Sequence, residues 1–253
     1  MEGIISFSWV KVNVFYYHYD KNNIFVLSSY HGLPIVLCFL GKEALIISDS
    51  LTRDFPISMK YDLITIRGAT TNKIYKYITE HRHCLQGYKI LVLHVGTNHF
   101  SSKEEWSWYL RFVQNKISRE EYNQAICSMN PPPANSRAVT FRDEYCRLLD
   151  LVKPEVSKVL VSAIIPRLWD HDRRDLVRRS YNRILEQLED FENVYFIPSF
   201  KPFFRQDHFR QELFHNDGLH LNELGSKVLC TYICDRVCRA IRGELKKKNW
   251  KLT

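Results

Sequence analysis

From residue 44 onward, short continuous apolar runs alternate with longer amphipathic stretches. Strands that are apolar on both faces belong to a parallel sheet that is covered by helices on each side. The pattern therefore predicts an α/β fold with about five parallel strands. The apolar runs are ALIIS (44–48), DLITIR (62–67), KILVLHV (89–95), KVLVSAI (158–164) and NVYFIP (193–198). Helices are expected at about 70–82, 102–116, 141–152, 172–190 and 222–243.

Residues 8–40 carry a different pattern. Val10, Val12 and Val14 alternate with polar residues, DKNN at 20–23 is typical of a turn, and two further apolar runs flank HGLP. This order of strands and turns predicts a β meander or hairpin before the main domain. The expected parts are an N-terminal β extension (1–42), a main domain (43–243) with a helical insert (101–136), and a basic tail (244–253).

The insert begins after the third apolar run. Two sequences fit a capping box, Ser102 to Glu105 and Ser118 to Glu121, in which a hydroxyl is followed three residues later by Glu. NPPPANS at 130–136 is expected to exclude helix and to break the chain. Helical spacing favours core positions over substrate contacts for the aromatic residues of the insert, Trp106, Trp108, Tyr109 and Phe112.

The basic balance of the chain is concentrated at its end. The net charge is +8, and residues 236–253 hold seven Lys or Arg against one Glu. A solubilising basic helix end is the favoured interpretation, and a local contact with nucleic acid is the alternative. Arg167 could touch an anionic substrate, although a surface salt bridge is favoured.

No apolar run reaches the roughly 18 residues that a membrane span needs. The run LPIVLCFLG at 33–41 stops at Lys42, and the first residues carry no basic leader. Seven cysteines, an odd number in a chain of 253 residues, do not indicate a disulfide framework. We therefore expect a soluble protein of the cytoplasm. Cys230, Cys234 and Cys238 are interpreted as a core stripe rather than metal ligands.

Chemistry-bearing residues follow the strands of the expected sheet. In an open parallel sheet such residues gather beyond the carboxyl ends of the strands. Ser50 follows the first run, Gly68 the second and Asn98 the third, and a later loop carries Asp217 and His220. Taken singly, each has an ordinary alternative: a helix cap, a turn glycine, an Asx turn or a surface histidine. Their ordered appearance favours a catalytic interpretation.

The roles follow from the residue types. A serine hydroxyl is a weak nucleophile until a base removes its proton, and that base must be held in one tautomer. His220 can be the base for Ser50, and Asp217 can accept a hydrogen bond from His220. The backbone N–H groups of Ser50 and Gly68 and the side-chain amide of Asn98 can form an oxyanion hole.

This set resembles the SGNH, or GDSL-type, hydrolase family. The matching blocks are SDSL (48–51), GATT (68–71), GTN (96–98) and DGLH (217–220), and the resemblance covers about 43–243. It implies a flavodoxin-like, three-layer α/β/α fold. It also implies hydrolysis of small-molecule, glycan or lipid esters through an acyl-serine, without metal or organic cofactor.

A second resemblance rests on HVGTN, on LNELG after the histidine and on NPPPA. These stretches are similar to esterase-like domains in animal genomes, some of them carried by non-LTR retrotransposon proteins. That setting would give the basic tail a possible role on nucleic acid.

The chain departs from the family pattern at two positions. Ser48 stands where the family has glycine, and His99 stands where it has Asp after the Asn. Neither change removes a catalytic group, but Ser48 could crowd the turn before Ser50. A catalytically inactive binding module on the same fold is therefore the alternative function.

Overall fold

The computed structural model describes residues 17–19, 25–28, 34–37, 42–56, 61–99, 103–129, 134–167, 172–206 and 208–247. The chain separates into two compact units, residues 1–42 and 43–253. The first unit is an antiparallel sheet of β1 (Tyr17–Tyr19), β2 (Phe25–Ser28) and β3 (Pro34–Leu37), in that order. It confirms the β meander expected from the sequence. The strand expected around Val10–Val14 lies outside the described residues.

The second unit is built on a five-stranded parallel sheet. The strand order is β5-β4-β6-β7-β8, so the first strand in sequence, β4, lies between β5 and β6. This sheet confirms the α/β prediction, and the predicted strand ends fall within two residues of the observed ones. The strands are β4 (Ala44–Ser48), β5 (Tyr61–Thr65), β6 (Ile90–His94), β7 (Lys158–Ser162) and β8 (Val194–Ile197).

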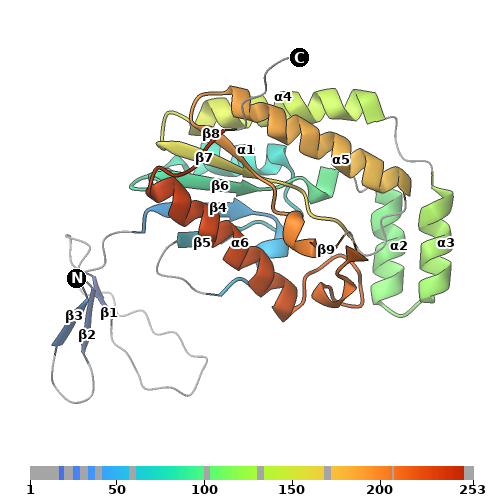
Figure 1. The fold of residues 1–253 in the computed structure, drawn as a ribbon. Coiled ribbons are helices and arrows are strands. Elements are labelled where there is room, and N and C mark those ends of the chain that lie inside the picture. Colours follow the sequence, from blue (N-terminus) through green and yellow to red (C-terminus); the bar gives the residue numbers. More distant parts are fainter. Residues whose placement is uncertain are drawn as a thin grey trace. The chain divides into compact units, whose positions relative to one another are not determined.

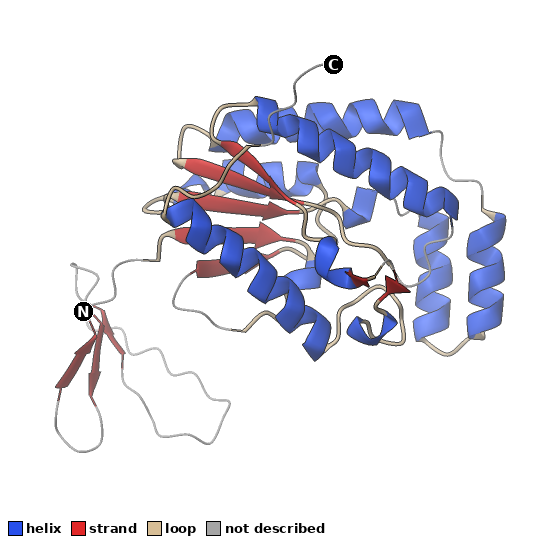
Figure 2. Ribbon diagram, in the orientation of Figure 1, coloured by secondary structure: helices blue, strands red, loops and turns tan. Residues whose placement is uncertain are grey.

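Helices cover both faces of this sheet. One face packs on α1 (Thr71–Glu80), α4 (Ala134–Val152) and α5 (Asp172–Gln187), and the other packs on α6 (Glu223–Ile241). Successive strand residues alternate between the two cores: Leu45 and Ile47 face the first group, whereas Ala44 and Ile46 face α6. Figures 1 and 2 show the resulting three layers, with the strands between the helices.

The start of α4 corrects one expectation. The predicted helix at 141–152 begins seven residues earlier, at Ala134, so the end of NPPPANS is helical rather than a break. Proline disrupts a helix interior because it lacks an N–H and clashes with the preceding turn. Just before or within the first turn neither penalty applies, and a helix can begin directly after a proline run.

The insert forms a pair of helices, α2 (Lys103–Val113) and α3 (Arg119–Ser128). Figure 1 shows them side by side, beyond the carboxyl ends of the sheet strands. Ser118 and Glu121 form the predicted capping box, whereas Ser102 lies outside the described residues. Tyr109, Tyr122 and Ile126 make a small core of their own, separate from the two large ones. Aromatic core packing in the insert is thus confirmed for Tyr109, and the partly buried Trp108 and Phe112 pack against it.

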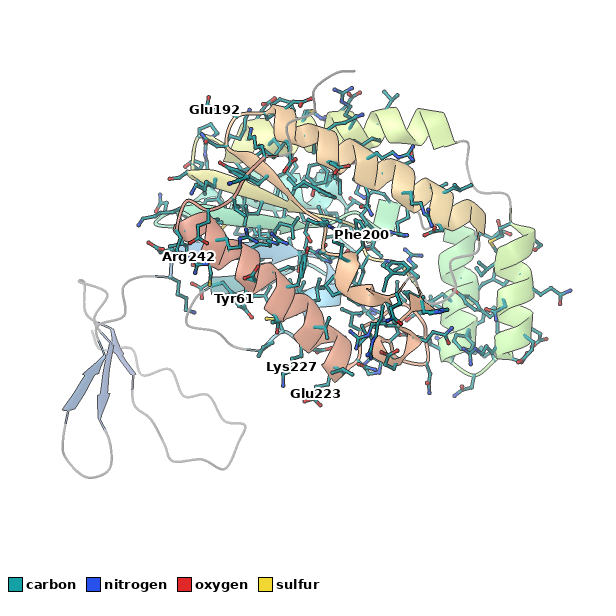
Figure 3. The ribbon with its side chains drawn as sticks, in the orientation of Figure 1. Tyr61, Glu192, Phe200, Glu223, Lys227 and Arg242 are labelled. Atoms are coloured by element: carbon teal, nitrogen blue, oxygen red, sulfur yellow. The ribbon has the colours of Figure 1, made fainter. Side chains whose placement is uncertain are left out.

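Short elements connect β8 to α6. They are η5 (Lys201–Phe203), β9 (Phe204–Arg205), β10 (His208–Phe209) and η6 (Gln211–Leu213). Another single turn, η4 (Leu188–Asp190), precedes β8. Figure 3 labels Glu223 and Lys227 at the end of α6 that lies on the side of α2 and α3, and Arg242 at the opposite end. The loop that precedes Glu223 is therefore placed near the carboxyl edge of the sheet.

The basic end of the chain makes contacts with its own domain. Lys247 Nζ donates hydrogen bonds to the carbonyl oxygens of Glu189 (2.8 Å) and Phe191 (2.6 Å). Residues 248–253 lie outside the described part. None of the helices that the structure describes is long and apolar enough to cross a membrane. Within the same ranges, no group of three His, Cys, Asp or Glu side chains could hold a metal ion.

Candidate active site

Ser50 lies where β4 gives way to a single turn of 3-10 helix, η1 (Ser50–Thr52). Asp49 is the N-cap of this turn, and its Oδ1 accepts the backbone N–H of Leu51 at 3.0 Å. The Ser50 side chain is half-buried, whereas Asp49 on one side and Leu51 on the other are buried. A sharp cap at the strand end therefore presents the Ser50 hydroxyl at the carboxyl edge of the sheet.

Asp217 and His220 occupy a tight loop between η6 and α6. An isolated bridge pairs Phe214 with Leu221, and Gly218, with φ of +65°, supplies the left-handed turn inside it. Asp217 Oδ1 accepts the backbone N–H groups of Leu219 and His220, both at 2.9 Å. These two hydrogen bonds fix one carboxylate oxygen, so that the other, Oδ2, points at the imidazole.

The three side chains form one continuous series. Ser50 Oγ lies 3.4 Å from His220 Nε2, and His220 Nδ1 lies 2.8 Å from Asp217 Oδ2. The serine and the histidine come from opposite ends of the domain sequence, 170 residues apart. With its proton on Nδ1 donated to Asp217, the imidazole presents the Nε2 lone pair to the serine hydroxyl.

Asp217 is ionised in this arrangement. Burial works to raise the pKa of its carboxyl, but hydrogen bonds from the His220 ring and from the backbone N–H groups of His220 and Leu219 outweigh burial and lower the pKa to about 2. A carboxylate that stays charged at neutral pH can hold the imidazole in one tautomer and stabilise an imidazolium.

Asn98 is joined to the loop that holds Gly68. Asn98 lies in η3 (Thr97–His99), directly after β6, and its Nδ2 donates to the carbonyl oxygen of Ala69 at 3.0 Å. Gly68 has φ of +61°, a conformation that side chains rarely adopt. Gly96 precedes η3, and a Cβ there would lie 2.5 Å from Ile164 Cδ1. Both glycines are therefore required by backbone geometry at the loops that carry the expected oxyanion donors.

Asp49 is a second carboxyl beside the serine. It is 1% exposed, and burial raises its pKa to about 6, although the hydrogen bond from Leu51 and the positive charge of Arg167 act against burial. Arg167 Nη2 donates to the carbonyl oxygen of Thr97 at 2.5 Å, next to Asn98. Arg167 thus takes part in the polar structure at the strand ends, a role that the sequence did not indicate.

Ser48 and His99, which depart from the family pattern, both make hydrogen-bonding contacts with nearby residues. The Ser48 hydroxyl is fully buried, donates to the Asp49 carbonyl oxygen and contacts the Thr52 hydroxyl. His99 Nε2 lies 2.9 Å from Thr71 Oγ1 and 3.2 Å from Glu144 Oε2. Both side chains are engaged within the domain rather than with Ser50 or His220.

Tyr109 is a site residue for which the sequence favoured a core position over a substrate contact. Its hydroxyl, from α2, donates to Asp217 Oδ2 at 3.1 Å and lies 3.4 Å from His220 Nδ1. The one signal in the sequence was that this member of the aromatic stripe carries a hydroxyl.

These features define the class of architecture to which the domain belongs: a three-layer α/β fold with a serine after its first strand and an Asp-His loop after its last. Comparison with solved structures shows that a GDSL-like lipase, a member of the lipolytic G-D-S-L family and an acetyl xylan esterase share this fold. No family model matches the chain, and no curated protein matches it in sequence.

Three solved structures illustrate the likeness. A GDSL-like lipase from Bacteroides thetaiotaomicron has a TM-score of 0.53 at 15% identity, over 79% of this chain and 89% of the other. A lipolytic G-D-S-L family member from Veillonella parvula has a TM-score of 0.54 at 14% identity, over 78% and 98% of the two chains. An acetyl xylan esterase has a TM-score of 0.53 at 16% identity, over 77% and 99%. At these identities the likeness shows a shared fold.

Proposed function

We propose that the second unit is a serine ester hydrolase with Ser50 as nucleophile, His220 as general base and acid, and Asp217 as the group that orients His220. The observation that supports this most strongly is the series Ser50 Oγ, His220 Nε2, His220 Nδ1 and Asp217 Oδ2, with distances of 3.4 Å and 2.8 Å across its two links. A nucleophile, a base and an oriented third group within hydrogen-bond reach are the signature of an activated serine.

The first half of the reaction forms the acyl-enzyme. Ser50 Oγ attacks the ester carbonyl carbon while its proton passes to His220 Nε2, and the carbonyl electron pair moves onto the carbonyl oxygen. The tetrahedral intermediate then collapses. The bond to the alcohol oxygen breaks, and that oxygen takes the proton from His220 as the alcohol leaves.

The second half returns the enzyme to its starting state. Water attacks the acyl carbon while His220 Nε2 accepts one of its protons. When this second intermediate collapses, the bond to Ser50 Oγ breaks and the serine recovers its proton from His220. The carboxylic acid product is released, so one ester and one water yield one acid and one alcohol.

The oxyanion formed in both steps needs donors that are already in place. We assign this role to the backbone N–H groups of Ser50 and Gly68 and to Asn98 Nδ2. The hydrogen bond from Asn98 to Ala69 supports the assignment because it fixes the amide beside the Gly68 loop and uses only one of its two N–H hydrogens. Removing one such donor typically costs about 3 kcal/mol of transition-state stabilisation.

The substrate class we propose is an ester of a small molecule, glycan or lipid. It is supported by the shared fold and by the names of two neighbours, a lipase and an acetyl xylan esterase. The chemistry needs a neutral imidazole at His220. Hydrolysis should therefore rise with pH as that imidazole loses its proton.

The direct test is hydrolysis of p-nitrophenyl acetate and butyrate by the purified chain and by a Ser50→Ala variant. We expect turnover by the parent and a loss of about 1,000-fold or more in kcat/KM for the variant, since the nucleophile is gone. Equal rates for the two proteins would refute the proposal. A folded parent that hydrolyses neither ester would favour a binding module on the same fold.

A further inference from the structure

The helical insert contacts the Asp-His loop. The Tyr109 hydroxyl of α2 donates to Asp217 Oδ2 at 3.1 Å, and the Tyr109 hydroxyl oxygen lies 3.4 Å from His220 Nδ1. Leu219, between those two residues in sequence, packs against the small apolar core of α2 and α3. The loop is therefore held by one polar and one apolar contact from the same element.

The ring of Tyr109 is held in place by the residues packed around it. Its side chain is 9% exposed and belongs to the insert core with Tyr122 and Ile126. Burial and the negative charge of Asp217 both raise the pKa of the Tyr109 phenol, so the hydroxyl keeps its proton and acts as a donor. A buried ring that aims a protonated hydroxyl at one carboxylate oxygen is a directional support, not a loose surface contact.

We propose that Tyr109 is a positioning residue for the Asp217–His220 pair, which it holds in register with Ser50. Its catalytic consequence rests on the function proposed above. The insert is then an element that completes the site, since removing it would take away both the hydroxyl and the packing of Leu219.

Tyr109 weakens the interaction of Asp217 with a protonated His220, because both residues donate to the same carboxylate oxygen. Asp217 Oδ2 receives hydrogen bonds from both the Tyr109 hydroxyl and the His220 ring. A second donor spreads the carboxylate charge over two partners, so less of it is available to stabilise a protonated imidazole. Without the Tyr109 hydroxyl, Asp217 would pair more strongly with the imidazolium, and His220 would keep its proton to higher pH.

Other charged and titratable groups act on this pair or on its neighbours. Asp49 and Asp54 near η1 interact with His220, and Arg53 interacts with Asp217. Arg67 beside Gly68 and Tyr122 on α3 interact with Tyr109, and His215 on the same loop interacts with Asp54. These groups are unchanged in Tyr109→Phe, so a comparison with the parent isolates the hydroxyl.

The test compares Tyr109→Phe with Tyr122→Phe in the full chain. Each variant removes one hydroxyl from the same insert core, and the hydrogen bond to Asp217 Oδ2 is donated by Tyr109. Proton NMR would follow the His220 imidazole, identified by its absence in a His220→Gln variant, through a pH titration. Thermal unfolding would confirm that both variants are folded.

We expect the titration midpoint of His220 to rise by about 0.3 to 1 pH unit in Tyr109→Phe and to stay within about 0.1 unit in Tyr122→Phe. An unchanged midpoint in Tyr109→Phe, or an equal shift in both variants, would overturn the proposal. Ester hydrolysis supplies the second readout. Tyr109→Phe should lower kcat about 3- to 10-fold and move the acidic limb of the pH profile upward.

The two readouts separate the two proposals. If the midpoint shifts as expected but the parent hydrolyses no ester, Tyr109 positions the pair and the hydrolase proposal fails. If the parent is active and neither the midpoint nor the acidic limb changes in Tyr109→Phe, the hydrolase proposal stands and the role of Tyr109 fails.

Discussion

Two serine–histidine clusters lie near the ends of neighbouring strands, β4 and β6, and they differ in burial and in charge. In the first, Ser50 faces His220, which is backed by Asp217, and the side chains of His220 and Asp217 are 22% and 19% exposed. In the second, His94 Nδ1 lies 2.7 Å from Ser162 Oγ, which in turn lies 2.7 Å from Ser199 Oγ. His94 is 2% exposed, and Ser162 and Ser199 are fully buried.

The difference shows what makes a histidine a base. Burial lowers the pKa of His94 to about 4, because a buried imidazolium loses the hydration that favours its charge. His220 has an ionised carboxylate beside its Nδ1, and its side chain is partly exposed. A serine–histidine contact therefore indicates catalysis only when a carboxylate and access for substrate accompany it. The second cluster is a hydrogen-bonded part of the core.

Removing the carboxylate of Asp217 is the strongest test of this difference between the two clusters. Asp217→Asn should lower kcat/KM for p-nitrophenyl esters by about 1,000-fold or more, because the amide neither stabilises the imidazolium nor selects its tautomer. Asp54→Asn is the matched control, since Asp54 is an exposed partner of Arg53 on the same side of the domain. A rate for Asp217→Asn within about 10-fold of the control would contradict the role given to Asp217.

The oxyanion assignment predicts the next largest effect. Asn98→Ala should lower kcat about 100-fold with little change in KM, because the amide is needed where charge develops and not in the ground state. Steady-state kinetics on one activated ester would measure both constants. A kcat within about 3-fold of the parent would remove Asn98 from the oxyanion hole.

The buried cluster of His94, Ser162 and Ser199 should make the free energy of unfolding depend on pH. The folded pKa of His94, about 4, lies below the ordinary value of 6.5. Its contribution is therefore complete above pH 6.5 and is lost as the pH falls from 6.5 to about 4, because the unfolded chain takes up the proton first. The full loss amounts to about 3 kcal/mol. Urea unfolding at pH 7.5 and 4.5 should show most of this loss in the parent.

A His94→Asn variant should lose less free energy of unfolding between these two pH values than the parent does, by about the same 3 kcal/mol. His83→Asn serves as the control, since His83 is exposed and should leave the difference unchanged. An identical pH dependence in His94→Asn and the parent would contradict the neutral, buried state assigned to His94.

The smallest predicted effect is that of Ser162→Ala, which should change stability but not catalysis. Ser162→Ala leaves His94 Nδ1 without its serine partner and should lower the free energy of unfolding by about 1 to 3 kcal/mol. Ester hydrolysis should stay within about 3-fold of the parent. A loss of activity as large as that expected for Ser50→Ala would mean that the buried serine takes part in the reaction.

The sheet was predictable because its central strands, β4, β6 and β7, are buried on both faces and so appear as apolar runs. The positions of Ser50, Asp217 and His220 could be anticipated because the carboxyl ends of parallel strands share one edge. The start of α4 was missed because a proline run was interpreted as a break, although it is compatible with a helix start. Tyr109 was missed because a stripe of aromatic residues gives no sign that one hydroxyl points outward to another element.

The buried cluster had a faint signal in the sequence. His94 and Ser162 interrupt the apolar runs KILVLHV and KVLVSAI, and the register that pairs Leu93 with Val161 carries these two residues to the same level of the sheet. Without that register, a polar residue at the end of an apolar run is indistinguishable from an ordinary strand end. Pairing between strands therefore supplied information that the sequence pattern lacked.

The most direct measurement of the central claim is mass spectrometry of the intact and digested chain after treatment with a fluorophosphonate. We expect one phosphonyl adduct, on the peptide that holds Ser50, and no adduct on the peptides of Ser162 or Ser199. The labelling should be lost in His220→Gln. A folded chain that stays unlabelled, or one whose adduct forms equally well without His220, would contradict an activated serine at position 50.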